Sequence, residues 1–217
     1  MDAPLGDRLA AYAEKLRELN FPFAEAYDNL IARMVAGEVG TMAPAVGAVM
    51  PPFILPSKNG TLVALEELTA RGPVVITFNR GHWCPFCKIQ LRSIAAFHNE
   101  IARAGAEVVS IMPDRQKFVR QIRKDTFDGL HILTDIDNGY SLSLGLVMVL
   151  GERLKELMKG RGIHLETYHG SDGWFVPLPA TFVVGRDSRV VARFVDPDFR
   201  KRMEVDEILS VLKSYKD

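Results

Sequence analysis

The first forty residues alternate apolar and polar positions with the period of an α-helix. The pattern is interrupted at 20–22 and ends near Gly37, so it predicts two amphipathic helices. Their apolar faces consist of Leu9, Tyr12, Ala13, Leu16 and Leu19 in the first helix and of Phe23, Tyr27, Leu30 and Met34 in the second. We interpret residues 1–41 as an N-terminal helical extension.

An apolar stripe does not by itself name the surface that it covers. These helices offer more apolar surface than a domain already complete from residue 53 needs, and such a patch is unusual on a soluble monomer. The stripe therefore favours a homodimer formed through the two helices. The alternative is that both helices fold back over the sheet of their own subunit.

From residue 53 onward, short apolar runs alternate with segments of helical period. Predicted strands cover 53–55, 61–65, 74–78, 107–111, 130–133, 181–184 and 190–195. Predicted helices cover 66–70, the segment from the cysteine pair to Gly105, 115–127, 140–146, 152–159 and 205–215. Residues 42–52 are typical of a linker. Together these elements indicate one α/β domain, residues 42–217, with a mixed sheet and helices on both faces.

Composition and charge limit the classes of partner and the cellular location that we expect. Of the 217 residues 47% are hydrophobic, and the 27 basic side chains equal the 27 acidic ones. Without a basic field, neither nucleic acid nor a membrane surface is an expected partner. The chain start lacks the features of a secretory signal, and the longest apolar run, 144–150, is too short to span a membrane. We therefore expect a cytoplasmic protein.

The most informative motif is the pair Cys84 and Cys87, the only cysteines of the chain. It lies where the predicted strand 74–78 gives way to a helix. Unpaired backbone N–H groups and the positive end of the helix dipole meet at such a point and favour thiolate over thiol. Cysteines in motifs of this kind can have pKa values of roughly 3.5–7.5. Because Cys84 is nearer the helix terminus, we expect it to be the more acidic of the two.

Two other interpretations of the pair carry less weight. A structural disulfide between residues three apart closes too small a loop to restrain the unfolded chain. A zinc site would need two further ligands, and the chain has no second cysteine pair to supply them. We therefore expect a redox couple that needs neither a metal ion nor a cofactor.

Three neighbours of the pair are candidates for supporting roles. Arg80 could lower the pKa of a thiolate and receive developing negative charge, although an exposed, solvated arginine is an equally good interpretation. Trp83 is expected to shield the site as a flat apolar wall. His82 could accept a proton near neutral pH, but a surface histidine is the favoured interpretation.

The order of elements resembles the thioredoxin-like fold: strand, Cys-x-x-Cys at a helix start, strand, helix, then a proline just before a final hairpin. In that fold a cis proline stands opposite the cysteine pair and its backbone aligns the substrate. The resemblance assigns this role to Pro179 and implies a cis peptide bond between Leu178 and Pro179.

Within that superfamily, residues 44 to the C-terminus resemble the peroxiredoxin-like branch of the alkyl hydroperoxide reductase and thiol-specific antioxidant (AhpC/TSA) family. The resemblance depends on the segments 52–56, 78–87 and 179–184 together. It implies an antioxidant enzyme that reduces hydroperoxides through a Cys84–Cys87 couple. An external thiol reductant of the thioredoxin or glutathione type would then reopen the resulting disulfide.

The chain also departs from the family pattern. Typical peroxiredoxins carry Pro-x-x-x-Thr-x-x-Cys, and placing Cys87 on the attacking cysteine puts Arg80 at the proline and Cys84 at the threonine. The arginine of the family falls at Pro179. The attacking cysteine therefore stays open, since helix geometry favours Cys84 and this alignment favours Cys87. A thiol-disulfide oxidoreductase without peroxidase activity and a non-catalytic scaffold protein remain alternatives.

Overall fold

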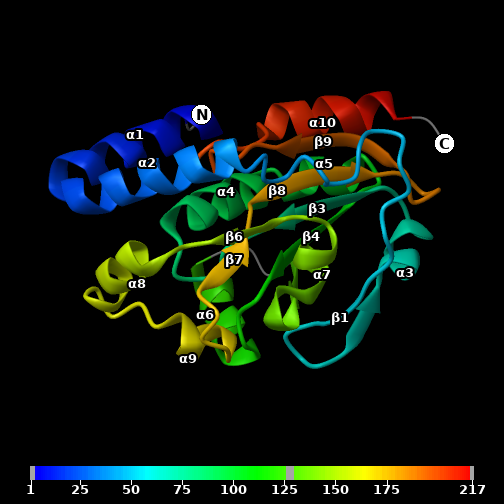
Figure 1. Ribbon diagram of the computed structural model, residues 1–217. Coiled ribbons are helices and arrows are strands. Elements are labelled where there is room, and N and C mark those ends of the chain that lie inside the picture. Colours follow the sequence, from blue (N-terminus) through cyan, green and yellow to red (C-terminus); the bar gives the residue numbers. More distant parts are fainter. Residues whose placement is uncertain (1–2, 126–129, 216–217) are drawn as a thin grey trace.

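The computed structural model describes residues 3–125 and 130–215. Its centre is a five-stranded sheet with the strand order β5-β4-β3-β8-β9 (Figure 1). The strands are β3 (Val74–Phe78), β4 (Glu107–Met112), β5 (His131–Thr134), β8 (Ala180–Val184) and β9 (Val190–Val195). Parallel pairing joins β3 to β4 and β4 to β5, while antiparallel pairing joins β3 to β8 and β8 to β9. The predicted mixed sheet is thus confirmed.

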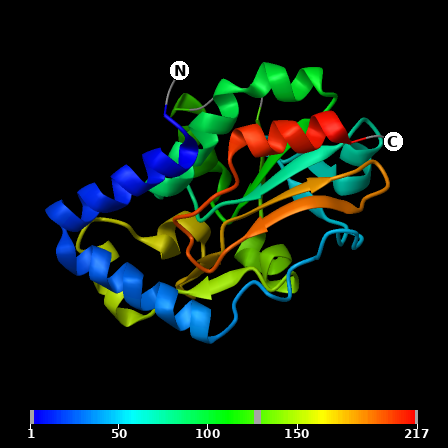
Figure 2. The ribbon, with the colours of Figure 1, turned by 90° about the horizontal axis from the view of Figure 1, so that it is seen from above.

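Helices cover both faces of the sheet, also as predicted. Side chains of β3 alternate, so that Val74, Ile76 and Phe78 enter one buried cluster and Val75 enters the other. The Val75 face packs against α4 (Pro85–Ala96), α5 (His98–Arg103), α6 (Gln116–Asp125) and α10 (Val205–Ser214). Figure 2 shows α10, in red, lying along the strands on this side.

Shorter elements close the opposite face. They comprise α3 (Leu65–Thr69), η1 (Ile136–Asn138), α7 (Gly139–Ser143), α8 (Glu152–Lys159), α9 (Leu165–His169) and two small antiparallel sheets, β1 (Ile54–Pro56) with β2 (Leu62–Ala64) and β6 (Val147–Val149) with β7 (Phe175–Pro177). The β1–β2 hairpin and its Asn59-Gly60 turn were predicted. Gly60 has a φ of +83°, the positive angle that such a turn requires.

The N-terminal helices α1 (Leu5–Leu19) and α2 (Phe21–Ala36) lie side by side and pack on their own subunit (Figure 1). Leu9, Tyr27 and Leu30 are buried in the same cluster as Phe78 of the central strand. Helix α1 contacts α4, and α2 contacts α8. Folding back over the chain's own domain is therefore the arrangement observed, and most of the apolar surface that favoured a dimer is buried within the subunit, although Leu19 stays exposed. The homodimer itself stays a prediction.

Several predicted boundaries were wrong, each for a local reason. The helix after the cysteines breaks at Phe97, whose φ of −108° and ψ of 15° end α4 before α5 begins. The predicted helix 140–146 ends early, since Gly145 has a φ of +68°. Strands β6 and β7 and helix α9 were not predicted, because three to five residues carry too little periodicity. Residues 126–127 of the predicted helix 115–127 lie outside the described residues.

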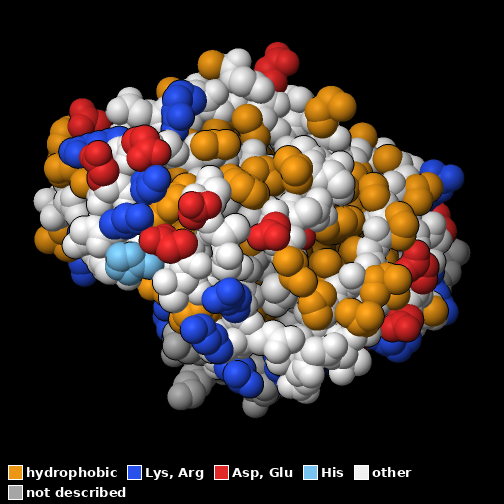
Figure 3. All heavy atoms as spheres, turned by 60° about the horizontal axis from the view of Figure 1, so that its bottom comes forward, with side chains coloured by type: hydrophobic (Ala, Val, Ile, Leu, Met, Phe, Trp, Pro, Cys, Tyr) orange, Lys and Arg blue, Asp and Glu red, His pale blue; other side chains and the backbone are white. Residues whose placement is uncertain are grey.

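The surface has two features that bear on function. No helix in the described ranges has both the length and the apolar character that crossing a bilayer requires. Apolar side chains gather on the face of Figure 3. Large exposed apolar residues of the elements at that end of the molecule include Ile54, Leu62, Ile136, Leu142 and Val149.

Candidate active site

The cysteine pair occupies the start of α4, at the carboxyl end of the central strand β3. Cys84 is the N-cap residue of the helix, and Pro85 takes the first helical position, where its missing N–H costs no hydrogen bond. The Sγ of Cys84 accepts a hydrogen bond from the backbone N–H of Cys87 at 3.4 Å. Both thiols are free, and their exposed fractions are 0% for Cys84 and 1% for Cys87. The strand-to-helix position was predicted correctly, whereas their burial was not.

Arg80 lies directly against Cys84. Its Nε is 3.3 Å and its Nη2 is 3.0 Å from the Cys84 Sγ, so the planar guanidinium presents two donors to one sulfur. The side chain is fully buried, so its interpretation as an exposed, solvated arginine is wrong. Its third nitrogen, Nη1, has no hydrogen-bond partner among the described residues. The N–H groups of this nitrogen therefore have no partner among the described residues.

Aromatic rings surround the guanidinium of Arg80. Its Cζ is 4.1 Å from the ring centroid of Phe199 and 5.3 Å from those of Tyr27 and Trp83. A cation over ring faces is stabilised by their quadrupoles, and the effect grows when water is excluded. We call these rings, together with Phe86 at 5.9 Å, the arginine cage. Trp83 thus packs beside the Arg80 guanidinium, while its shielding role stays a prediction, and Tyr27 brings helix α2 into the site.

The groups around the two cysteines shift their pKa values in opposite directions. Burial alone would raise the pKa of the Cys84 thiol. Hydrogen bonding from the Cys87 thiol, the positive charge of Arg80 and the Cys87 N–H overcome burial and lower the pKa of Cys84 to about 5. Burial and the neighbouring Cys84 thiolate raise the pKa of Cys87 well above its ordinary value. These shifts favour Cys84 as the thiolate and Cys87 as the thiol at neutral pH; that Cys84 is the more acidic cysteine stays a prediction.

A second buried arginine approaches the other cysteine. Nη2 of Arg202 is 4.0 Å from the Cys87 Sγ, and the backbone N–H of Arg80 donates to the same sulfur at 3.4 Å. Two guanidinium cations beside two sulfurs make this a poor place for a metal ion, because they repel it and favour an anion. In residues 3–125 and 130–215, no group of three or more histidines, cysteines or carboxylates is placed to hold a metal.

His82 belongs to a separate polar cluster. It is largely buried, and its ring stacks on Phe118, so the interpretation as a surface histidine is wrong. The fully buried carboxylate of Asp114 accepts hydrogen bonds from the His82 backbone N–H at 2.7 Å and lies 2.9 Å from the ring Nδ1. Asp114 thus fixes the loop that leads into Cys84, and His82 makes no hydrogen bond to either sulfur.

The peptide bond between Leu178 and Pro179 is trans, which contradicts the cis bond implied by the thioredoxin resemblance. The chain passes here from β7 into β8 in extended form, a conformation that suits the residue before a trans proline. Pro179 itself is buried. Strand β8 reaches the cysteine helix through a hydrogen bond from Gln90 to the hydroxyl of Thr181 at 3.2 Å.

Four further residues of the site were not predicted from the sequence: Tyr27, Asp114, Phe199 and Arg202. Asp114 carried a usable signal, because it follows β4, and the carboxyl ends of the parallel strands β3 and β4 meet at one edge of the sheet. Phe199 and Arg202 lie in an irregular segment between β9 and α10, where no periodic pattern marks a buried side chain.

Substituting Gly81 by alanine should destabilise the loop before Cys84. Gly81 has a φ of +135°, and an added Cβ would lie 2.6 Å from the Trp83 Nε1 and 2.8 Å from the Asp114 Oδ2. The strained angle alone costs of order 1–3 kcal/mol, and crowding adds to it. Gly47 is the matched control, since it has a φ of +86° with nothing within 4 Å. Denaturant unfolding should show a larger loss of stability for Gly81→Ala than for Gly47→Ala, and equal losses would contradict the crowded loop.

The chain is similar in sequence and in structure to proteins of one known family. The AhpC/TSA family profile matches residues 46–193. The chloroplastic peroxiredoxin Q of Sedum lineare is 25% identical over 170 residues, which are 78% of each chain. Among solved structures, peroxidoxin BcpB from Mycobacterium tuberculosis has a TM-score of 0.61 at 21% identity, covering 80% of this chain and 99% of that one. Peroxiredoxin 6 of Arenicola marina has a TM-score of 0.62 at 18% identity, with 78% and 72% covered.

The structural likenesses show a shared fold. The family match spans more than half of the chain and contains Arg80, Cys84 and Cys87 at the junction of β3 and α4. The chain therefore belongs to the AhpC/TSA family, as a peroxiredoxin-like, thiol-dependent oxidoreductase with the thioredoxin-like fold.

Proposed function

We propose that this protein reduces hydroperoxides, with Cys84 as the attacking cysteine and Cys87 as the resolving one. The observation that carries the proposal is the buried Cys84 sulfur held by two nitrogens of Arg80, while its third nitrogen, Nη1, has no hydrogen-bond partner within residues 3–125 and 130–215. The thiolate supplies the nucleophile. The free donor offers a place for the oxygen on which negative charge develops as the peroxide bond breaks.

The reaction has three steps. The Cys84 thiolate attacks the terminal oxygen of the hydroperoxide, an S–O bond forms and the O–O bond breaks. The alkoxide leaves and takes up a proton to become the alcohol, or water when the substrate is hydrogen peroxide. Cys84 is left as a sulfenic acid, which the Cys87 thiol converts to a Cys84–Cys87 disulfide with release of water. An external thiol of the thioredoxin or glutathione type returns the pair to the reduced state, a step for which the oxidised pair must first become exposed.

Burial favours a peroxide over a disulfide as the substrate. A disulfide carried by another protein must bring its own sulfur into line with the attacking sulfur, which requires an exposed thiolate. Cys84 has no exposed surface, and the arginine cage covers the arginine beside it. A small hydroperoxide needs far less space. The alternative of a disulfide reductase without peroxidase activity thus loses support from the geometry, and the lowered pKa of Cys84 argues against an inert scaffold protein.

The test is a comparison of two rates for the reduced protein. We expect hydrogen peroxide to oxidise it at least about 100-fold faster than it oxidises free cysteine at pH 7, because the thiolate is preformed and the leaving oxygen is stabilised. Reduction of a model disulfide should be much slower. Stopped-flow fluorescence of Trp83 and Trp174, with Cys84→Ser as the blank, measures both. A fast disulfide reaction with peroxide no faster than free cysteine would establish the disulfide reductase, and no reaction with either would establish the scaffold.

We also propose a cellular location, roles for two further residues and an oligomeric state. We place the protein in the cytoplasm, where a free cysteine pair is kept reduced. We assign Trp83 to shielding the site and Pro179 to shaping the chain that enters β8. A homodimer remains part of the proposal, supported now by the exposed apolar side chains on the face of Figure 3 and no longer by the N-terminal helices.

A further inference from the structure

A buried chain of polar contacts reaches Cys87 through Thr181, Gln90 and Arg202. Arg202 has an exposed fraction of 6%, and its Nη2 is 4.0 Å from the Cys87 Sγ. The Nε of Arg202 donates to the Gln90 Oε1 at 2.9 Å, and the Gln90 Nε2 donates to the Thr181 hydroxyl at 3.2 Å. Nη1 of Arg202 donates to the carbonyls of Phe199 and Lys201. The guanidinium is therefore fixed in place, with one nitrogen directed at the sulfur.

In the first half of the proposed reaction Arg202 has only a minor part. Its charge is the smallest of the named contributions that lower the pKa of Cys84, which has Arg80 as its hydrogen-bonded partner, while Cys87 is still a neutral thiol. The thiolate of Cys84 is also what holds Cys87 in the thiol form, together with burial. Once Cys84 has become a sulfenic acid, its negative charge is gone. The positive charges facing Cys87, those of Arg80 and Arg202, are then opposed by burial but no longer by a neighbouring thiolate, and they favour the Cys87 thiolate.

We propose that Arg202 is a catalytic residue of the resolving step, in which it stabilises the Cys87 thiolate that attacks the Cys84 sulfenic acid. This inference rests on the proposed function and adds a residue to it. In the step an S–S bond forms and the S–O bond of Cys84 breaks. The departing hydroxide takes the proton lost by Cys87 and leaves as water. The Cys87 sulfur is oxidised and the Cys84 sulfur is reduced, so no other reactant is needed.

Gln90 is the positioning residue of this arrangement. It lies three residues after Cys87 on α4 and is buried. Its amide has a donor and an acceptor, and both are used: one toward β8, the other toward Arg202. Gln90 thereby ties the arginine to the same helix that carries the cysteine, which keeps the sulfur and the guanidinium in register.

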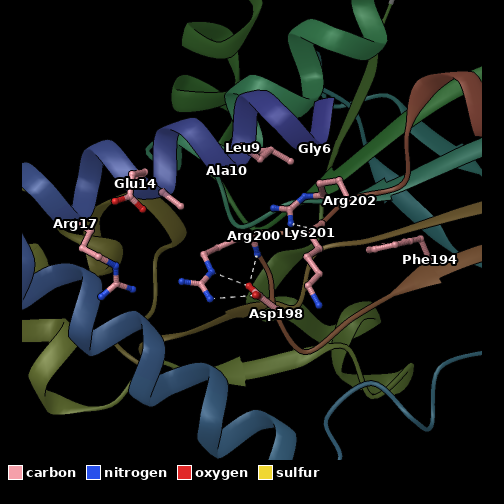
Figure 4. A pocket seen from close by; sticks show the side chains of 11 residues that line it. Gly6, Leu9, Ala10, Glu14, Arg17, Phe194, Asp198, Arg200, Lys201 and Arg202 are labelled. Atoms are coloured by element: carbon pink, nitrogen blue, oxygen red, sulfur yellow. Dashed lines mark hydrogen bonds and ion pairs between the residues drawn. The ribbon is translucent and has the colours of Figure 1, made fainter. Parts of the chain in front are cut away.

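The surroundings of Arg202 make a sharp test possible. Its side chain lines a cavity of about 540 Å³ between α1 and the segment 198–202, together with Leu9, Ala10, Phe194 and Lys201 (Figure 4). Removing the side chain in Arg202→Ala would open a space beside Cys87 that continues into this cavity. A free guanidinium ion can then enter and supply the missing charge and N–H donors.

The experiment follows both half-reactions of the full-length protein by stopped flow, with dimedone trapping and mass spectrometry to count sulfenic acid. In Arg202→Ala we expect peroxide to oxidise Cys84 at close to the wild-type rate, while the sulfenic acid persists about 10- to 100-fold longer. Guanidinium chloride at millimolar concentration should restore resolution several-fold, whereas tetramethylammonium chloride, a cation without N–H donors, should not. Lys213→Gln, which removes an exposed positive charge on α10, should resolve like the wild type.

Two results would overturn the assignment. One is a sulfenic acid in Arg202→Ala that disappears at the wild-type rate; the other is an equal slowing of both half-reactions without guanidinium rescue, which a merely structural role predicts. If Arg202→Ala does not fold, Arg202→Lys is the second variant. It keeps the positive charge but loses the guanidinium hydrogen bond to Gln90, so it should slow the resolving step and leave the oxidation of Cys84 unchanged. Wild-type protein that forms no sulfenic acid with peroxide would instead refute the proposed function.

Discussion

Replacing Cys84 by serine should abolish peroxide reduction, whereas replacing Cys87 should leave one turnover intact. Cys84 alone has both the donors of Arg80 and a pKa lowered to about 5, so it alone is a thiolate at neutral pH. Cys87→Ser keeps that thiolate and loses only the thiol that resolves the sulfenic acid. A thiolate without a resolving partner proceeds to sulfinic acid when peroxide is in excess.

Mass spectrometry after one equivalent of hydrogen peroxide measures this contrast. Cys87→Ser should gain one oxygen and react with dimedone, while Cys84→Ser should stay unmodified over the same time. The wild type should lose two hydrogens and resist alkylation. The reverse pattern, with sulfenic acid on Cys84→Ser, would make Cys87 the attacking residue and restore the assignment that the family alignment favoured.

Replacing Arg80 by methionine should raise the pKa of Cys84 and slow its reaction with peroxide by at least about 100-fold at pH 7. The positive charge of Arg80 would be lost while burial, which favours the thiol, would remain. A smaller fraction of Cys84 would then be ionised at pH 7. Losing a preorganised donor for the leaving oxygen contributes a further factor of about 10²–10³. Methionine fills much of the same volume within the arginine cage, so shape is largely kept.

The pH dependence of the oxidation rate separates these two effects. In the wild type the rate should be constant above pH 6 and fall by half near pH 5, since protonating the thiolate removes the nucleophile. In Arg80→Met the half-point should move to higher pH, and the rate at high pH should stay below that of the wild type. Arg17→Met is a control that removes an exposed, ion-paired arginine far along α1. An unchanged half-point in Arg80→Met would show that other groups set the acidity of Cys84.

The parts of the fold that were predictable have strong local patterns. Strand β3 is a run of five buried, mostly β-branched residues, and β9 and α8 have the bounds that their apolar periodicity indicated. Helix α9 and the β6–β7 ribbon have three to five residues each, and their stability comes from packing against the rest of the molecule. A local sequence pattern carries no information about that packing.

The same distinction applies to the site. Cys84, Cys87 and Arg80 stand within eight residues of one another, so their spacing on a strand-to-helix junction was visible in the sequence. That Arg80 is buried was not, because its cage is assembled from Tyr27 on α2 and Phe199 near the C-terminus. A buried cation is tolerable only when distant segments supply its surroundings, and sequence periodicity says nothing of contacts across more than a hundred residues.

The arginine cage has a consequence for how this chemistry is inherited. Tyr27 precedes the family-matched segment 46–193, while Phe199 and Arg202 follow it. A relative that shared only the central segment would keep both cysteines and Arg80, yet its arginine would lie open to water and its thiolate would be less strongly stabilised. Differences in the terminal flanks can therefore retune the reactivity of an unchanged cysteine motif. Grafting these flanks onto a related domain, rather than editing the motif, is the route by which that reactivity would be transferred.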